Sequence, residues 1–199
     1  MNAITISRQM GSWGCEIAGA VAERLGYRVV WREVINQAAS RARTPEVALA
    51  TIDELNLLGL KPSLDEVRAY HSAVREIMHE LAETGKVVIV GRAGQVILQG
   101  VEGVLHVRIY APLELRVQRI AEQHNVSAEA ALARVTTSDQ SRLSYLRRYY
   151  HARWDDIALY DVCVNTARFS VEAAAEIICG AAQARLGLHA APPGQSAPC

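Results

Sequence analysis

A glycine-bearing loop at residues 8–16 holds side chains whose types and spacing indicate phosphate chemistry. The loop reads RQMGSWGCE; a short apolar, β-branched run at residues 3–7 precedes it, and a helical pattern follows it. Free backbone N–H groups and the dipole of the following helix favour an anion at such a place. The residues expected to bind the phosphates of a nucleotide are Arg8, Gly11, Ser12, Trp13, Gly14, Cys15 and Glu16.

The loop departs from a complete P-loop at two positions. A complete P-loop ends in GK followed by Ser or Thr, where the lysine reaches the phosphates and the hydroxyl holds magnesium. Counting from Gly14, Cys15 stands at the lysine position and Glu16 at the hydroxyl position. A thiol cannot make the charge-assisted bond of a lysine, so we expect Arg8 to supply that charge. The alternative interpretation of the loop is an ordinary strand-to-helix turn. Cys15, at a helix N-terminus, could be a reactive thiol or a small residue that fills the loop.

A second group of candidate residues lies in an arginine- and tyrosine-rich helical segment, residues 127–156. Phosphoryl transfer leaves charge on three equatorial oxygens, and catalysis is mostly positioning and electrostatic stabilisation. Arginine forks match phosphate geometry and stay charged, and a mobile lid that carries them would exclude water. The predicted catalytic lid set is Asp139, Arg142 and Arg148. For any one arginine, a solvated helical face is the alternative.

The elements that must position these residues follow an alternating pattern. Apolar runs that read as strands occur at residues 3–7, 27–30, 87–91, 105–111 and 161–165, with helical patterns between them. Such alternation predicts an α/β fold with a five-stranded parallel sheet covered by helices on both faces. Ligands of these sheets bind at the carboxyl ends of the strands, and the candidate loops all follow strands.

Composition narrows the class of protein. The chain has 199 residues, a length that suits a single domain. Its formal net charge of zero gives no electrostatic reason to expect nucleic acid or membrane partners. No apolar run approaches the length of about 18 residues that spans a membrane. The four cysteines show neither disulfide nor metal-ligand spacing. We therefore expect a cytoplasmic protein without a protein-built metal site.

Several segments, in order and spacing, resemble the cytidylate kinase-like family of P-loop proteins. They are ITISRQMGSWGCEIAGAVAERLGY at 4–27, VVIVGRAG at 87–94, IYAPLELRVQRI at 109–120 and YDVCVNTARFSVEAAAEII at 160–178. The resemblance implies a three-layer P-loop kinase fold over a single domain, residues 1–188. It also implies a helical, arginine-rich lid at about 127–156. The composition of the tail at 189–199, which is rich in Pro, Gly and Ala, predicts disorder there.

The resemblance also implies substrates and acceptor-side residues. ATP with Mg²⁺ would donate its γ-phosphoryl group to a nucleoside monophosphate or a similar small acceptor. Related kinases bind the acceptor with a GRD-like segment, which makes Arg92 the candidate for the acceptor phosphate or base, together with Gly94 and Arg32; Ala93 replaces the aspartate of that pattern. Trp31 and Trp154 could stack on a base, although core packing is their usual role. A homodimer is left open.

Two alternatives to an active kinase remain at this stage. Trp13, Cys15 and Ala93 depart from the family pattern, and a catalytically impaired nucleotide-binding protein that acts as a sensor or scaffold would explain them. A dinucleotide-binding oxidoreductase is the other alternative, because Glu33 lies about 20 residues after the loop, where a ribose-binding acid is expected. The loop, however, is not GxGxxG.

Overall fold

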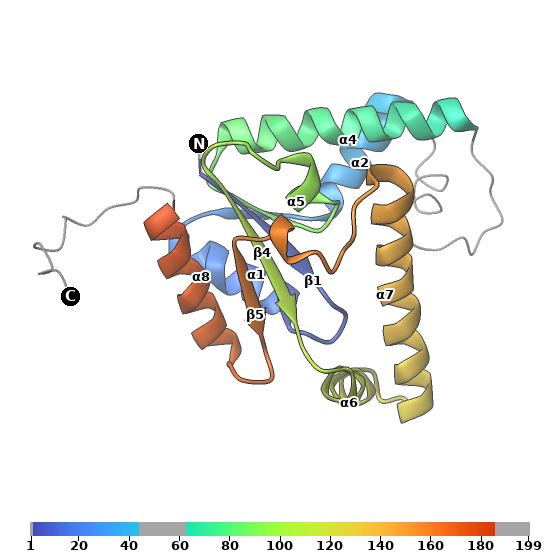
Figure 1. The fold of residues 1–199 in the computed structure, drawn as a ribbon, viewed down its shortest axis with the longest axis vertical. Coiled ribbons are helices and arrows are strands. Elements are labelled where there is room, and N and C mark those ends of the chain that lie inside the picture. Colours follow the sequence, from blue (N-terminus) through green and yellow to red (C-terminus); the bar gives the residue numbers. More distant parts are fainter. Residues whose placement is uncertain (1, 44–62, 186–199) are drawn as a thin grey trace, which may run out of the picture.

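The computed structural model describes residues 2–43 and 63–185, and its centre is a five-stranded parallel sheet (Figure 1). The strands lie in the order β2-β3-β1-β4-β5. Their bounds are β1 Ala3–Arg8, β2 Arg28–Val30, β3 Val87–Val90, β4 Val104–Tyr110 and β5 Val162–Asn165. The predicted α/β class and the five parallel strands are confirmed, with strand ends shifted by about one residue.

The central strand β1 is buried along its whole length, which explains its continuous apolar character. Its side chains alternate between the two faces of the sheet. Ile4 and Ile6 face the cluster that includes Ile17 and Val21, whereas Ala3 belongs to the cluster of Tyr70 and Met78 on the other face.

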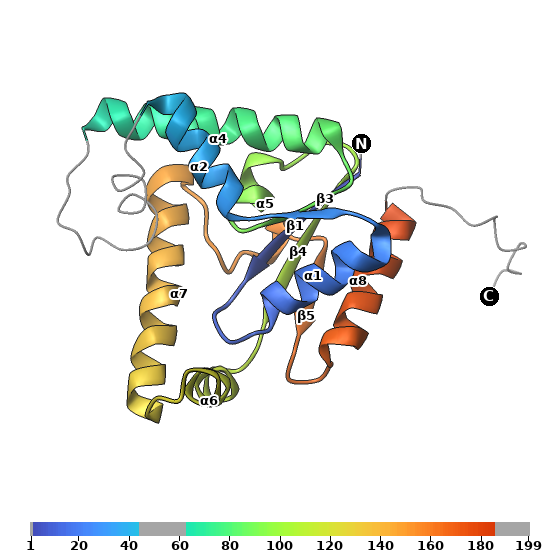
Figure 2. The same ribbon diagram turned by 180° about the vertical axis from the view of Figure 1, so that it is seen from behind.

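Helices cover both faces of the sheet and produce three layers (Figures 1 and 2). α1 Gly14–Leu25 and α8 Val171–Arg185 pack on one face. α2 Arg32–Ala42, α4 Leu64–Thr84 and the short α5 Gly94–Ile97 pack on the other. Among the residues that the structure describes, no helix is both long and apolar enough to cross a membrane.

The predicted lid segment forms one long helix. α6 Leu113–His124 leads into α7 Ala128–Tyr150, and a 3₁₀ turn at Ile157–Leu159 follows. The first turns of α7 pack on α6 through Ala131 and Val135. Its last turns place Tyr145 and Leu146 in the cluster of α4, so α7 spans from α6 to the sheet domain (Figure 1).

The predicted helix starts are confirmed by their caps. Ser63 and Glu66 form a reciprocal capping box before α4, and Gly85 ends that helix. The Ser127 side chain accepts a hydrogen bond from the Ala130 N–H before α7. The tail predicted at 189–199 lies outside the described residues.

Candidate functional site

The loop between β1 and α1 leaves free N–H groups at the start of a helix. The first intrahelical bond runs from the Ile17 N–H to the carbonyl of Trp13, the N-cap residue, at 2.9 Å. The N–H groups of Gly14, Cys15 and Glu16 precede that bond. This backbone can receive an anion, as the sequence predicts, and Cys15 and Glu16 are exposed beside it.

The two glycines of the loop allow close approaches that a side chain would block. Gly11 has φ +76°, and a Cβ there would lie 2.7 Å from the carbonyl oxygen of Arg116. A Cβ at Gly14 would lie 2.4 Å from the Cβ of Arg8. Glycine is therefore needed at both positions because the loop is packed between two arginine-bearing segments.

Ser12 maintains the shape of the loop. Its side chain is fully buried, and its hydroxyl lies 2.8 Å from the Gln9 carbonyl and 3.4 Å from the Ile109 carbonyl, to which it donates. The hydroxyl is thus turned toward the protein interior. Its backbone N–H also donates to the Gln9 carbonyl, at 3.4 Å, so the predicted contribution of Ser12 to phosphate binding stays a prediction.

Trp13 and Arg119 form a stacked pair at the other side of the loop. The guanidinium carbon of Arg119 lies 3.3 Å from the indole centroid, within cation–π range. Arg119 also donates to the Gly11 carbonyl at 3.2 Å and to the Thr166 side chain at 2.9 Å and carbonyl at 2.8 Å. Burial lowers the pKa of Arg119, and nearby Glu16 partly offsets this effect. The bulky indole is therefore held by a fixed cation.

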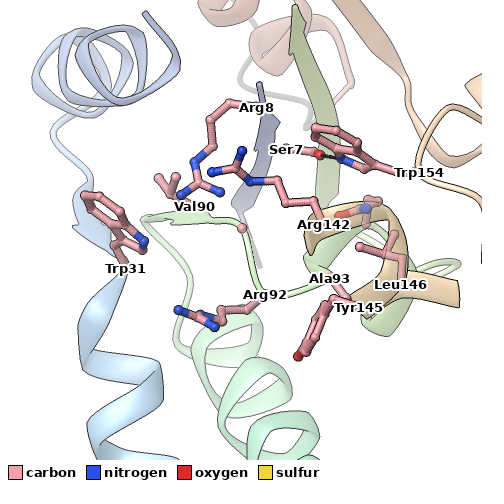
Figure 3. A pocket seen from close by; sticks show the side chains of 12 residues that line it. Ser7, Arg8, Trp31, Val90, Arg92, Ala93, Arg142, Tyr145, Leu146 and Trp154 are labelled. Atoms are coloured by element: carbon pink, nitrogen blue, oxygen red, sulfur yellow. Dashed lines mark hydrogen bonds between the residues drawn. The ribbon is translucent and has the colours of Figure 1, made fainter. Parts of the chain in front are cut away.

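Three arginines from three different elements line one pocket beside this loop (Figure 3). Arg8 ends β1, Arg92 follows β3, and Arg142 extends from α7. In Figure 3, Trp31 lies at one end of the pocket and Trp154 at the other. No carboxylate is among the described residues that line it. A pocket lined by three arginine forks favours an anionic ligand.

Arg8 connects the loop at residues 8–16 to the pocket. Its Cβ packs over Gly14, and its Nη1 lies 2.9 Å from where a Cβ of Gly91 would be. Its guanidinium carbon is 5.4 Å from the Trp31 ring centroid. The side chain therefore runs from the start of α1 to Gly91, and its role in supplying the charge of the absent lysine stays a prediction.

Arg92 is a half-buried charge in the pocket. Burial, and to a lesser degree the positive charges of Arg8 and Arg142, lowers the pKa of Arg92 to about 10, although Tyr145 and Tyr150 act in the opposite direction. The guanidinium remains charged at neutral pH. An anionic ligand would relieve the repulsion among the three cations.

Trp154, for which the sequence left base stacking or core packing open, forms a wall of the pocket with partners that were not predicted. Its indole N–H donates to the Ser7 hydroxyl at 2.8 Å, and its carbonyl accepts from the Tyr160 hydroxyl at 2.8 Å and from Arg108. Gln95 donates to Tyr160 at 3.4 Å and also lines the pocket. Trp154 is 4 % exposed, so it is a fixed wall, and only its position after the lid could have indicated this.

The free space between these side chains is a cavity of about 40 Å³. Typical small-molecule sites enclose about 300–1,000 Å³. A nucleotide can therefore enter only when the walls separate. Since Arg142, Tyr145 and Leu146 belong to α7, movement of that helix would open the pocket, in accordance with a lid.

The structure separates the three predicted lid residues. Arg142 lines the pocket, whereas Arg148 is exposed and lines a different groove between α4 and α7. Asp139 pairs with Arg116 at 2.9 Å. Gly94 is buried, and a Cβ there would lie 3.0 Å from the methyl group of Thr5. Arg32 begins α2, and its side chain lies outside the described ones.

The residues near the loop can accommodate ATP and, in part, magnesium. Free N–H groups at the start of α1 suit the donor phosphates. In the described parts of the chain, no three acidic, histidine or cysteine side chains gather into a metal site. Mg²⁺ commonly keeps several waters and binds through substrate phosphates and one or two carboxylates. Glu16 is the carboxylate in the first turn of α1.

Comparisons with known proteins agree with this geometry. A family model described as the Cytidylate kinase-like family matches residues 3–168. A cytidylate kinase of Halobacterium salinarum is 28% identical over 186 residues, which cover 91% of this chain and 89% of that protein. A cytidylate kinase of Methanocaldococcus jannaschii is 30% identical over 104 residues, 51% of this chain and 58% of that protein.

Solved structures show the fold. An uncharacterized protein from Eubacterium ventriosum has a TM-score of 0.73 at 22% identity, covering 93% of this chain and 100% of that chain. A shikimate kinase from Acinetobacter baumannii, in complex with shikimate, has a TM-score of 0.52 at 14% identity and covers 94% of both chains. These likenesses confirm the P-loop kinase fold and do not favour the dinucleotide-binding alternative.

Proposed function

The chain belongs to the cytidylate kinase-like family, and we propose that it transfers the γ-phosphoryl group of ATP to a nucleoside monophosphate or a similar small phosphate acceptor. One observation supports this most. Arg8, Arg92 and Arg142 meet without a carboxylate in a pocket beside the phosphate loop. A phosphate acceptor offers negative charge and oxygens that match three arginine forks, whereas a neutral sugar or alcohol offers them no charge.

The proposed reaction needs positioning more than acid–base chemistry. An oxygen of the acceptor phosphate attacks the γ-phosphorus, the bond to the oxygen bridging the β- and γ-phosphates breaks, and ADP leaves with that electron pair. A phosphate oxygen is already a nucleophile at neutral pH, so the chain needs no general base. Arg92 orients the acceptor, Arg142 stabilises the charge of the transferred group, and the N–H groups of Gly14 and Cys15 bind the donor phosphates.

Arg8 takes the position of the absent lysine in this proposal. Its stem packs over Gly14 of the loop and its guanidinium lies beside Gly91 in the pocket, and in this proposal it contacts the phosphates of both substrates. Magnesium, when bound, neutralises charge on the β- and γ-phosphates. Glu16 and phosphate oxygens would hold it. The roles predicted for Arg32, Arg148 and Asp139 stay predictions, as do a homodimer and a cytoplasmic location.

A catalytically impaired nucleotide-binding protein is the second candidate. It is favoured by the exposed Cys15 at the lysine position and by the Trp13 indole stacked on Arg119. Both features reduce the number of groups in the loop that can bind a γ-phosphate. This candidate predicts nucleotide binding without turnover, either as a sensor or as a scaffold.

The deciding experiment is a calorimetric titration with ATP–Mg²⁺, followed by an ADP-release assay over a panel of nucleoside monophosphates. We expect binding and acceptor-dependent release of ADP. Arg142→Ala should lower kcat/KM by about 100-fold or more, because a charge-stabilising arginine in phosphoryl transfer is worth about 10³–10⁵. The control Arg134→Ala removes an exposed arginine from the same helix and should change kcat/KM by less than twofold. Binding without turnover supports the second candidate, and no binding refutes both.

A further inference from the structure

A groove on the outer surface gathers a second set of arginines. It lies between α4 and α7, and we name it the α4/α7 groove; the residues that matter here are Arg68, His71, Ser72, Arg75, Arg148 and Tyr149. Its volume is about 350 Å³, which is in the range of small-molecule sites. None of these residues lines the pocket of Arg142, so the groove is separate from the candidate active site.

The helical spacing on α4 builds one side of the groove. Arg68, His71 and Arg75 stand at i, i+3 and i+7, which places them on one face of the helix. Arg148 and Tyr149 approach from the end of α7. The three guanidinium groups thus come from two helices that pack together only in the folded chain.

Aromatic rings hold two of these arginines. The guanidinium carbon of Arg75 lies 5.6 Å from the Tyr150 ring centroid, and that of Arg148 lies 5.4 Å from the Tyr149 centroid. Tyr149 in turn packs on His71, with ring centroids 4.3 Å apart. The rings restrict the positions of the charges, which lowers the entropic cost of binding a ligand.

Acidic neighbours compensate these charges weakly. Asp65 lies 3.6 Å from Arg68, but the two side chains are 93% and 79% exposed, and such solvated pairs are worth little. Glu76 accepts a hydrogen bond from Ser72 at 3.2 Å and lies 3.8 Å from Arg41, outside the groove. Neither acid lines the groove itself.

His71 presents a polar atom without a partner at this place. Its Nε2 atom is buried and has no hydrogen-bond partner among residues 2–43 and 63–185. Its Nδ1 atom lies 3.2 Å from the Tyr150 hydroxyl. Burial, with a contribution from Arg75, lowers the pKa of His71 to about 4, so the ring is neutral at pH 7.

We propose that the α4/α7 groove is a second anion site, which binds a small molecule carrying two or more phosphate groups. The three guanidinium groups are donors without acceptor capacity. They match a diphosphate better than a single phosphate, because more oxygens are needed to satisfy them. This proposal does not depend on catalysis at the other pocket.

The groove also contacts the wall of the active-site pocket. His71 pairs with Tyr150, and the Tyr150 hydroxyl lies 3.5 Å from that of Tyr145, which lines the pocket of Arg142. A ligand in the groove therefore binds to the same aromatic cluster that shapes the pocket. Either inorganic diphosphate or the diphosphate of a nucleotide would provide the required chemistry.

The test is calorimetric titration of the full chain with inorganic pyrophosphate and, separately, with ADP. The test variant is the double substitution Arg68→Gln/Arg75→Gln. The control is Arg24→Gln/Arg168→Gln, which removes the same charge from exposed positions elsewhere. We expect the wild-type chain to show a pyrophosphate site that the test variant weakens at least tenfold and the control leaves within twofold. ADP release without added pyrophosphate should be unchanged in the test variant.

The titrations with pyrophosphate and with ADP distinguish the possible outcomes. Loss of a pyrophosphate site in the test variant supports the proposal, and a larger loss for ADP than for pyrophosphate identifies a nucleotide as the ligand. Equal stoichiometry and affinity in wild type, control and test variant would overturn it. So would a single site in the wild-type chain that Arg142→Ala abolishes and Arg68→Gln/Arg75→Gln leaves intact. Inactivity of the wild-type chain in the kinase assay would affect only the proposed function.

Discussion

Arg116 and Asp139 form a buried ion pair, with Nη1 and Oδ2 2.9 Å apart, that fastens α7 to α6. Arg116 also donates to the Ala111 carbonyl at 3.0 Å and to the Met10 carbonyl at 3.4 Å. Its own carbonyl fills the space beside Gly11. The pair therefore connects the helix that carries Arg142 to the backbone of the phosphate loop, which gives Asp139 a positioning contact.

Removing the charge of Asp139 should destabilise the fold strongly. Asp139→Asn leaves the Arg116 guanidinium, only 5% exposed, without its counter-charge, and breaking such a pair costs about 3–5 kcal/mol. Urea unfolding measures the loss. Asp65→Asn, which affects an exposed pair with Arg68, serves as control and should cost less than about 1 kcal/mol. Equal losses in the two variants would contradict the importance of the buried pair.

A methyl group at Gly14 should disturb nucleotide binding, whereas one at Gly19 should not. The Cβ of Gly14→Ala would lie 2.4 Å from the Cβ of Arg8, so Arg8 or the start of α1 must shift. We expect ATP affinity to fall at least tenfold in a calorimetric titration. Gly19 lies in the same helix with nothing within 4 Å of its Cβ position, and Gly19→Ala should stabilise the fold by about 0.5–1 kcal/mol. Unchanged affinity in Gly14→Ala would show that the loop does not depend on this contact.

The charge of Arg8 should be needed for both substrates. A charge-assisted hydrogen bond is worth about 1.5–3 kcal/mol, so Arg8→Ala should weaken ATP binding by about 10- to 100-fold. Arg8→Lys should recover only part of this affinity, because lysine lacks the planar fork. Arg28→Lys, at an exposed position of β2, is the control. If Arg8→Ala bound ATP as tightly as wild type, another group would have to replace the absent lysine.

Acid should destabilise the fold partly through His71. Its pKa is about 4 when folded and 6.5 when unfolded, so the unfolded chain binds the additional proton between these values. The contribution is fully present above pH 6.5 and is lost as the pH falls through 4. Each unit of pKa difference corresponds to about 1.4 kcal/mol, but solvent around the partly exposed ring weakens the effect. We therefore expect His71 to contribute about 2 kcal/mol to the free energy of unfolding.

His71→Phe isolates this effect from the titration of carboxylates. The variant keeps an aromatic ring against Tyr145, Tyr149 and Tyr150 but cannot take up a proton. Unfolding free energies at pH 4 and pH 7 should therefore differ less in the variant than in the wild-type chain. Parallel pH profiles in the two proteins would mean that His71 does not titrate as described.

The fold could be predicted because its signals are local. The apolar run of β3, the Ser63 capping box and the glycine after α4 each act within a few residues. The pocket was harder to predict from the sequence, because the Trp154 indole contacts Ser7, which lies 147 positions away in the sequence. No periodicity in either segment encodes that contact, so it depends on how the segment after α7 returns to the sheet.

Helical geometry could have separated Arg142 from Arg148. Six residues correspond to about 600° of rotation at 3.6 residues per turn, which places the two side chains about 120° apart. One therefore enters the pocket while the other lines the α4/α7 groove. Spacing alone was enough to show that both cannot face the same phosphate without bending α7.

The stem of Arg8 packs over Gly14 and its guanidinium lies beside Gly91. One side chain therefore contacts both the loop at residues 8–16 and the pocket. Under the proposed function, donor and acceptor preferences therefore cannot evolve as independent traits in this chain. A substitution selected at the loop for a different donor changes how Arg8 lies and so alters the choice of acceptor. Laboratory evolution toward a new acceptor should repeatedly bring second-site changes at the start of α1.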